Sequence, residues 1–110
     1  MTIEDSDTID AAGIAKDNGD VVLTIADHLS WHDEQAHFRL IERKINRYLD
    51  FVESGQLVEE LPQAKGRRVR ISLICRHKPS DLAARVLSAA KQQLREAGIE
   101  FSYQPLPKEY

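Results

Sequence analysis

One unbroken helical periodicity, which runs from Trp31 to Gly55, most constrains what this chain can fold into. Apolar side chains recur there at steps of three and four residues, which places them on one face of an α-helix roughly 30 Å long. The apolar positions are Phe38, Ile41, Ile45, Tyr48, Leu49 and Val52. The charged positions between them are Arg39, Glu42, Arg43, Lys44, Arg47, Asp50 and Glu53. We therefore expect an amphipathic helix that covers a sheet or another helix and keeps its charged face in water.

The length of 110 residues fits one domain, and we expect residues 1–110 to form a single unit whose ordered core runs from about residue 8 to about residue 104. No apolar run approaches the ~20 residues that a membrane-spanning helix needs. The first ten residues, MTIEDSDTID, carry acids where a secretory signal carries positive charge, so we expect a cytoplasmic protein without membrane contact. Cys75 is the single cysteine, which excludes an intramolecular disulfide and a cysteine-rich metal site.

The segment before the long helix, residues 9–25, has the pattern of a β-hairpin. Asn18 and Gly19 lie between two apolar runs, and both residue types tolerate the positive φ angles of a tight turn. A two-residue loop at this point would pair Ile14 with Leu23 and Ala12 with Ile25. These four side chains would then share one face of the hairpin.

Capping residues predict where the long helix begins and ends. Ser30 stands directly ahead of the helical pattern and is the expected N-cap, while Gly55 is the expected stop. The following residues 56–67 contain Pro62 and Gly66, and we expect them to form an ordered loop.

The clearest strand in the chain is RVRISLICR, residues 68–76, which alternates with a period of two. Its apolar side consists of Val69, Ile71, Leu73 and Cys75. A second helix is expected from Ser80, its N-cap, to Ala97, with Gly98 ending it. A last strand follows, in which Ile99, Phe101 and Tyr103 share one side.

The predicted order is β-β-α-β-α-β, which defines an α+β fold with a mixed four-stranded sheet. The last two strands are expected to be parallel, because a helix joins them and returns the chain to the same end of the sheet. Two helices suffice to cover one face only, so we expect a two-layer sandwich with two helices on one face and an open face on the other side. The expected open face consists of Val22, Thr24, Arg68, Arg70, Ser72, Ile74, Arg76 and Glu100.

Four segments of the chain carry a resemblance. They are GDVVLTIADHLSW, the helix ending INRYLDFVESG, the stretch LPQAKGRRVRISLICRHKPS and the closing AGIEF. Together they resemble a family of short uncharacterised bacterial proteins, a domain of unknown function with a V-L-T-I-x-D-H-L-x-W signature. The resemblance spans about residues 8–104 and is most specific in the D-H-L-x-W segment. It implies a small bacterial cytosolic protein and brings no established activity, ligand or catalytic residue with it.

The junction between the hairpin and the long helix gathers Asp27, His28, Trp31 and His32, and His37 follows one turn later. Loop residues of this kind often carry function. Two histidines on a helix share a metal ion when they are three or four residues apart and so lie on one face. His32 and His37 are five residues apart, which separates them by about 140° around a helix. We therefore expect no metal here, and we expect Asp27 and His28 to bond to the junction backbone while Trp31 packs on the start of the helix.

The remaining candidates for chemistry have simple structural explanations. Ser30 is explained as a helix cap, and Cys75 falls on the apolar side of its strand, where a thiol is usually an inert small side chain. The five glycines are isolated, so no phosphate-binding loop is present. We expect no cofactor, and no catalytic set of residues supports an enzyme.

The distribution of charge suggests what the protein binds. Residues 1–34 hold nine acidic residues and one lysine, whereas residues 35–110 hold nine acidic and fourteen basic residues. The leading hypothesis is a non-catalytic protein-binding module, an adaptor or an immunity-like protein, that uses the open face to contact another protein or to form a homodimer. The binding residues would be Arg68, Arg70, Ile74, Arg76, Val22 and Thr24.

Two alternatives remain open at this point. The basic residues from Arg68 to Lys78 could contact phosphates of a nucleic acid, although the strand offers no aromatic residue for base stacking and the pI is near 5.8. The second alternative is an enzyme or a metal site at the junction of Asp27, His28 and His32, with Trp31 beside them.

Overall fold

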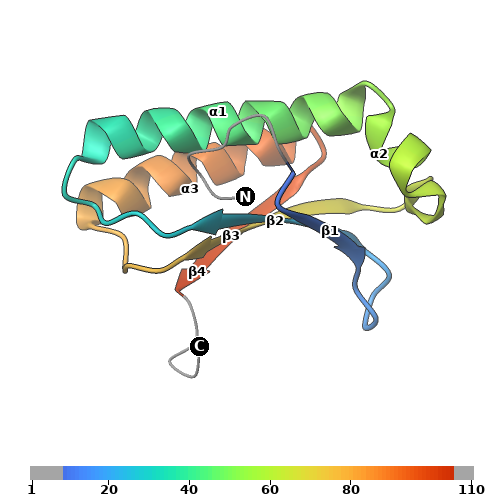
Figure 1. The fold of residues 1–110 in the computed structure, drawn as a ribbon, viewed down its shortest axis with the longest axis horizontal. Helices are drawn as coiled ribbons and strands as arrows, with labels where there is room; N and C mark the ends of the chain where they lie inside the picture. Colours follow the sequence, from blue (N-terminus) through green and yellow to red (C-terminus); the bar gives the residue numbers. More distant parts are fainter. Residues whose placement is uncertain (1–8, 106–110) are drawn as a thin grey trace.

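The computed structural model describes residues 9–105, and the expected tails fall largely outside this range. Within it the chain forms the predicted order of strands and long helices (Figure 1). The strands are β1 (Ala11–Ile14), β2 (Val21–Asp27), β3 (Val69–Cys75) and β4 (Glu100–Pro105). The helices are α1 (Glu34–Glu53), α2 (Gln56–Glu60), α3 (Asp81–Glu96) and the 3-10 helix η1 (Pro62–Ala64). None of the described helices is long and apolar enough to cross a membrane.

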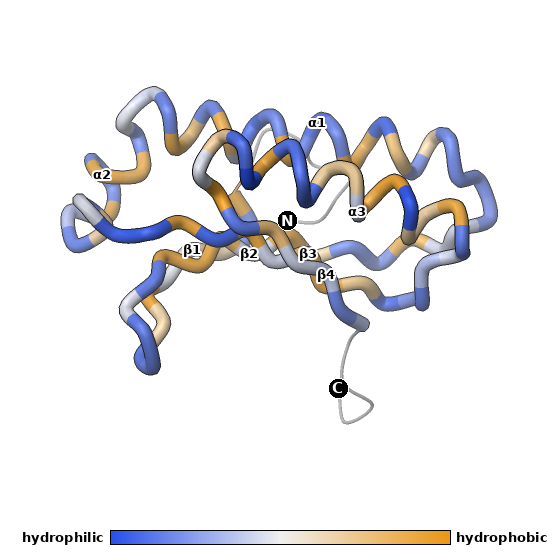
Figure 2. Tube along the Cα trace, turned by 180° about the vertical axis from the view of Figure 1, so that it is seen from behind, coloured by the Kyte–Doolittle hydropathy of each residue, from blue (hydrophilic) through white to orange (hydrophobic). Residues whose placement is uncertain are grey.

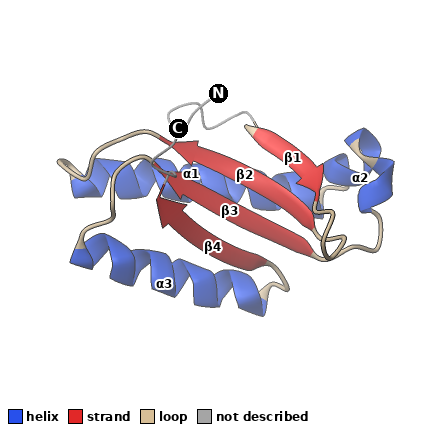
Figure 3. Ribbon diagram, turned by 90° about the horizontal axis from the view of Figure 1, so that it is seen from below, coloured by secondary structure: helices blue, strands red, loops and turns tan. Residues whose placement is uncertain are grey.

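The four strands form one mixed sheet in the order β1-β2-β3-β4 (Figure 3). The β1–β2 pair is antiparallel, and the β2–β3 and β3–β4 pairs are parallel, as predicted for β3 and β4. A parallel pair requires a crossover, and α1 and α3 provide the two that are needed. The predicted α+β fold and mixed sheet are therefore confirmed.

The register of the hairpin differs from the prediction by two residues. Ile14 pairs with Val21 and Ala12 pairs with Leu23, so the loop is longer than the expected Asn18–Gly19 turn. Side chains within the loop stabilise this longer form, because Asn18 Oδ1 accepts a hydrogen bond from the backbone N–H of Asp20 at 2.9 Å. A shift of two residues keeps each side chain on its face of the sheet, so the predicted faces are still correct.

Both long helices lie on the same side of the sheet (Figure 1). The sheet side chains that face them are fully buried in the two central strands, as in Leu23, Ile25, Ile71 and Leu73. Along α1 and α3 hydrophilic and hydrophobic positions alternate with each turn, as Figure 2 shows. Burial of these apolar faces between helices and sheet forms the core.

The long helix differs from the prediction at its start and in its buried face. Asp33, and not Ser30, is the N-cap, because its side chain accepts a hydrogen bond from the backbone N–H of Ala36 at 3.2 Å. Lys44, predicted to be in water, is fully buried, and His37 is buried as well. The helix ends at Glu53, two residues before the predicted stop residue Gly55, and Ser54 is its C-cap.

The segment 56–67, predicted to be a loop, contains α2 and η1. Leu57 and Ala64 anchor these two turns in the core. Arg67 ties the segment to the hairpin loop, since its guanidinium donates to the backbone oxygen of Gln63 at 2.7 Å and to that of Gly19 at 3.0 Å. The helix α3 begins as predicted, with Ser80 Oγ accepting a hydrogen bond from the N–H of Ala83 at 3.1 Å.

Candidate functional site

The candidate binding surface is the open face, the side of the sheet away from α1 and α3 (Figure 3). Strand register arranges its side chains in cross-strand rows. The rows are Gly13, Val22, Arg70 and Glu100, then Ala11, Thr24, Ser72 and Ser102, and then Ala26, Ile74 and Gln104. The middle row therefore carries three neighbouring hydroxyl groups, which can each donate and accept hydrogen bonds.

The predicted residues of the open face lie together. Val22, Thr24 and Ile74 are half-buried by their neighbours on the sheet, and Arg70 is half-buried beside them. Arg68 lies at one end of β3 and Arg76 at the other, and both are exposed. The surface thus combines a small, partly apolar centre with cations at its ends.

Arg68, one of the cations of the open face, has a long and exposed ion pair. Arg68 Nη1 lies 3.7 Å from Glu100 Oε1, and both side chains are at least half exposed. An exposed ion pair of this length contributes little to stability. Arg68 is therefore available to exchange this contact for one with a ligand.

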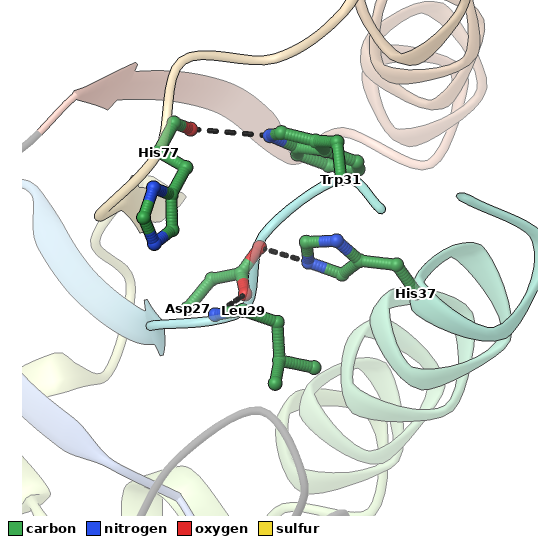
Figure 4. Close-up of polar contacts among 5 residues, drawn as sticks. All are labelled: Asp27, Leu29, Trp31, His37 and His77. Atoms are coloured by element: carbon green, nitrogen blue, oxygen red, sulfur yellow. Dashed lines mark hydrogen bonds and ion pairs between the residues drawn. The ribbon is translucent and has the colours of Figure 1, made fainter. Parts of the chain in front are cut away.

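At the junction of β2 and α1 the structure brings two of the considered residues into contact (Figure 4). Asp27, at the end of β2, approaches His37, in the first turns of α1, with Oδ2 and Nε2 2.5 Å apart. Its other oxygen accepts a hydrogen bond from the backbone N–H of Leu29 at 3.1 Å. Both partners are buried, so this pair joins the strand to the helix inside the core.

Trp31 packs against His37 at the junction. Its indole stacks on the ring of His37 with 3.8 Å between centroids, and its Nε1–H donates to the backbone oxygen of His77 at 3.1 Å (Figure 4). The indole therefore connects the loop before α1 to the loop before α3. These contacts give Trp31 a packing role.

Two further histidines lie on the surface near this pair. His28 and His32 are exposed, whereas His37 is buried. Among residues 9–105 no group of three or more His, Cys, Asp or Glu side chains is placed to hold a metal ion. A catalytic use of the buried pair would also need a substrate to reach it, and Asp27 and His37 are each only 2% exposed.

Cys75 lies beside Asp27 in the sheet register and is buried. Burial, reinforced by the nearby Asp27 carboxylate, raises the pKa of the Cys75 thiol to about 12. The thiol therefore stays protonated at neutral pH, and a protonated, inaccessible thiol is a poor nucleophile.

A second buried polar cluster, which sequence reasoning missed, lies under the middle of α1. Lys44 Nζ contacts Asp10 Oδ1 at 2.8 Å, with side-chain exposures of 0% and 5%. The hydroxyl of Tyr48 accepts from the backbone N–H of Asp10 at 2.8 Å and donates to the backbone oxygen of Thr24 at 2.5 Å. Asp10 Oδ2 also accepts from the N–H of Ala26 at 2.9 Å, so the cluster fastens the hairpin to α1.

Hollows also mark the surface outside these clusters. A groove of about 470 Å³ lies between α1 and α3, with Ile45, Leu49 and Val86 among its lining residues. A smaller pocket of about 200 Å³ lies at the free edge of β4. Its lining residues are Arg70, Lys91, Arg95, Glu100, Phe101 and Ser102.

Comparison with known proteins adds one finding. A family model described as a family of unknown function (DUF6572) matches residues 1–107. No match was found among curated proteins or among solved structures. The match agrees with the resemblance seen in the sequence, and the description of the family names no activity.

Proposed function

The chain belongs to this family of unknown function, and we propose that it is a non-catalytic protein-binding module, of an adaptor or immunity-like kind, that works through its open face. The observation that carries the proposal is the asymmetry of the sheet. One side meets α1 and α3, whereas the other side presents its rows of side chains without a covering element among the described residues (Figure 1). An uncovered sheet surface with a few apolar side chains suits contact with another protein.

The composition of the open face favours a separate partner over a permanent homodimer. Obligate dimers bury interfaces that resemble a domain core. Here Val22 and Ile74 are the large apolar side chains, and hydroxyls and arginines surround them. The arginines favour a partner with acidic side chains, because Arg pairs with carboxylates in bidentate geometry.

Neither alternative gains a supporting observation. Sheet-based readers of RNA stack bases on exposed aromatic rings. In β4 the aromatic residues Phe101 and Tyr103 face the helices, and the former is buried. At the junction, Asp27 and His37 are buried, so a substrate in solvent would not reach this pair.

Quantitative capture from the source cells tests the proposal. The wild-type protein is compared with the open-face variant Arg70→Glu/Arg76→Glu and with a control, Arg39→Glu/Arg43→Glu, which makes the same change of charge on exposed positions of α1. We expect a protein that the wild type and the control retain and that the open-face variant loses. For that protein the open-face variant should bind at least about tenfold more weakly, or about 1.4 kcal/mol. Equal retention by the two double variants would refute the proposal.

A further inference from the structure

We propose that the free edge of β4 binds an extended acidic segment of the partner protein, which adds to the sheet as a fifth strand. This inference rests on the proposed function and specifies where the partner begins its contact and what chemistry it carries.

The strand β4 lies at one edge of the sheet. It is the last strand of the sheet, and within the described residues it pairs only with β3. About half of the backbone N–H and C=O groups of residues 100–104 therefore point away from the sheet, which makes the edge a template for another strand. Its six residues span roughly 20 Å, enough to pair with a segment of similar length.

Cations lie around this edge. The pocket of about 200 Å³ receives Lys91 and Arg95 from α3 and Arg70 from β3. Lys91 and Arg95 lie one turn apart on α3 and are exposed, and Glu100 is the one carboxylate in the lining. A strand added here has side chains on both faces, so its acidic residues would meet Arg70 on the open face and Lys91 and Arg95 on the helix side.

The opposite edge of the sheet lacks these features. The strand β1 has only four residues, and the shallow surface over it is lined by small, mostly apolar residues. Those residues are Ala11, Ala12, Gly13, Ile14, Ala15, Val22 and Thr24. No charged side chain lines that surface among the described residues, whereas three cations line the β4 pocket, so the β4 pocket is the one of the two that attracts an acidic segment.

An extended peptide explains the combination better than a nucleic acid does. A free strand edge offers main-chain hydrogen bonds that a peptide backbone matches and a phosphodiester backbone does not. Glu100 in the pocket would repel a carboxylate and a phosphate alike, so these main-chain hydrogen bonds are what favour the peptide.

The test uses the full chain and a short synthetic peptide in which adjacent pairs of glutamates alternate with adjacent pairs of valines, so that carboxylates lie on both faces of the added strand. Three further probes accompany it: the same peptide N-methylated at alternate amides, its lysine counterpart and an oligothymidylate of equal length. Binding is followed by fluorescence anisotropy and by amide chemical shifts of β4. We expect the glutamate peptide to bind, with the largest shifts in residues 100–104, and the other three probes to bind at least tenfold more weakly.

A variant and its control place the site. Lys91→Glu/Arg95→Glu should weaken peptide binding at least tenfold, whereas Arg39→Glu/Arg43→Glu should not change it. If the Glu variant does not fold, Lys91→Gln/Arg95→Gln replaces it, with a smaller loss in the same direction. Absence of binding, equal binding of the N-methylated or lysine peptide, or equal binding of the oligothymidylate would each overturn the inference.

The cellular capture experiment separates this inference from the proposed function. A partner that the Lys91→Glu/Arg95→Glu variant retains, and that Arg70→Glu/Arg76→Glu loses, would overturn the β4 site and leave the open face as the contact surface. A partner that both variants retain would overturn the proposed function as well.

Discussion

Lys44 shows how a single residue fixes the position of the long helix. Its ammonium group is fully buried and lies 2.8 Å from the carboxylate of Asp10, at the start of the hairpin. Burial of a charge is costly unless a partner compensates it, and here the partner comes from an element 34 residues away in the chain. The pair therefore selects one placement of α1 over the sheet.

Replacing Lys44 with Met should lower the free energy of unfolding by about 3 kcal/mol, because it leaves the Asp10 carboxylate buried without its counter-ion. The double variant Asp10→Asn/Lys44→Met should recover part of this loss. Urea denaturation of the purified variants measures both effects. The exposed neighbour provides the control, and Arg43→Met should change stability by less than about 0.5 kcal/mol. Equal effects at the two positions would mean that Lys44 is not buried.

Cys75 gives a prediction for alkaline pH. Its pKa is about 12 in the folded protein and 9.0 in the reference state, so above pH 9 the unfolded chain loses a proton that the folded chain keeps. The contribution of Cys75 to stability is thus complete below pH 9 and is lost as the pH rises from there toward 12. At pH 10.5 the loss should reach about 2 kcal/mol, at 1.36 kcal/mol per pH unit.

Urea midpoints of the wild type and of Cys75→Ala between pH 7 and pH 10.5 check this prediction, since the variant lacks the thiol and should lose less stability over that range. The raised pKa of Tyr48, caused mainly by burial, acts in the same direction and is present in both proteins. Parallel decline of the two proteins would therefore assign the alkaline loss to groups other than Cys75.

At the scale of elements, the caps of the helices provide a direct comparison. Asp33 caps α1 and should cost about 1 kcal/mol of stability when it is changed to Ala. Ser30, which precedes the helix and is exposed, should be nearly neutral in the same substitution. Ser80→Ala should cost at least as much as Asp33→Ala, because Ser80 Oγ also donates to Glu34 Oε2 at 2.6 Å. Thermal denaturation of the three variants measures the order, and a larger loss at Ser30 would contradict it.

Sequence reasoning predicts these elements well where one periodicity dominates. The alternation in β3 and the apolar stripes of the helices reflect local geometry, and so their type and order could be predicted. The hairpin register and the cap of α1 could not be predicted, since several nearby residues compete for each role. Asn18 stabilises a longer loop than the Asn-Gly pair suggests, and Asp33 competes successfully with Ser30.

At the scale of the whole molecule, the parts that sequence missed are contacts between distant segments. The open face could be predicted, because one alternating strand and two helices determine which side is covered. The pairs of Asp27 with His37 and of Asp10 with Lys44 could not be predicted. A charged residue at a position that the sequence pattern assigns to solvent gives no sign that it has a buried partner. The β4 pocket was missed for the same reason, because it joins Arg70 to Lys91 and Arg95 of another element.

The open face and the core meet in consecutive residues of the central strand β3. Leu73 points toward the helices and is fully buried, whereas Ile74 points to the open face and is half-buried. Leu73→Lys should prevent folding, because it places an unpaired charge in the core. Ile74→Lys should fold and lose no more than about 1 kcal/mol, the range of strand propensities.

The affinity of Ile74→Lys for the captured partner tests the central claim most directly. The account predicts a folded protein, with a urea midpoint close to that of the wild type, that binds the partner at least about tenfold more weakly. Wild-type affinity in that folded variant would show that the open face is not where the partner binds.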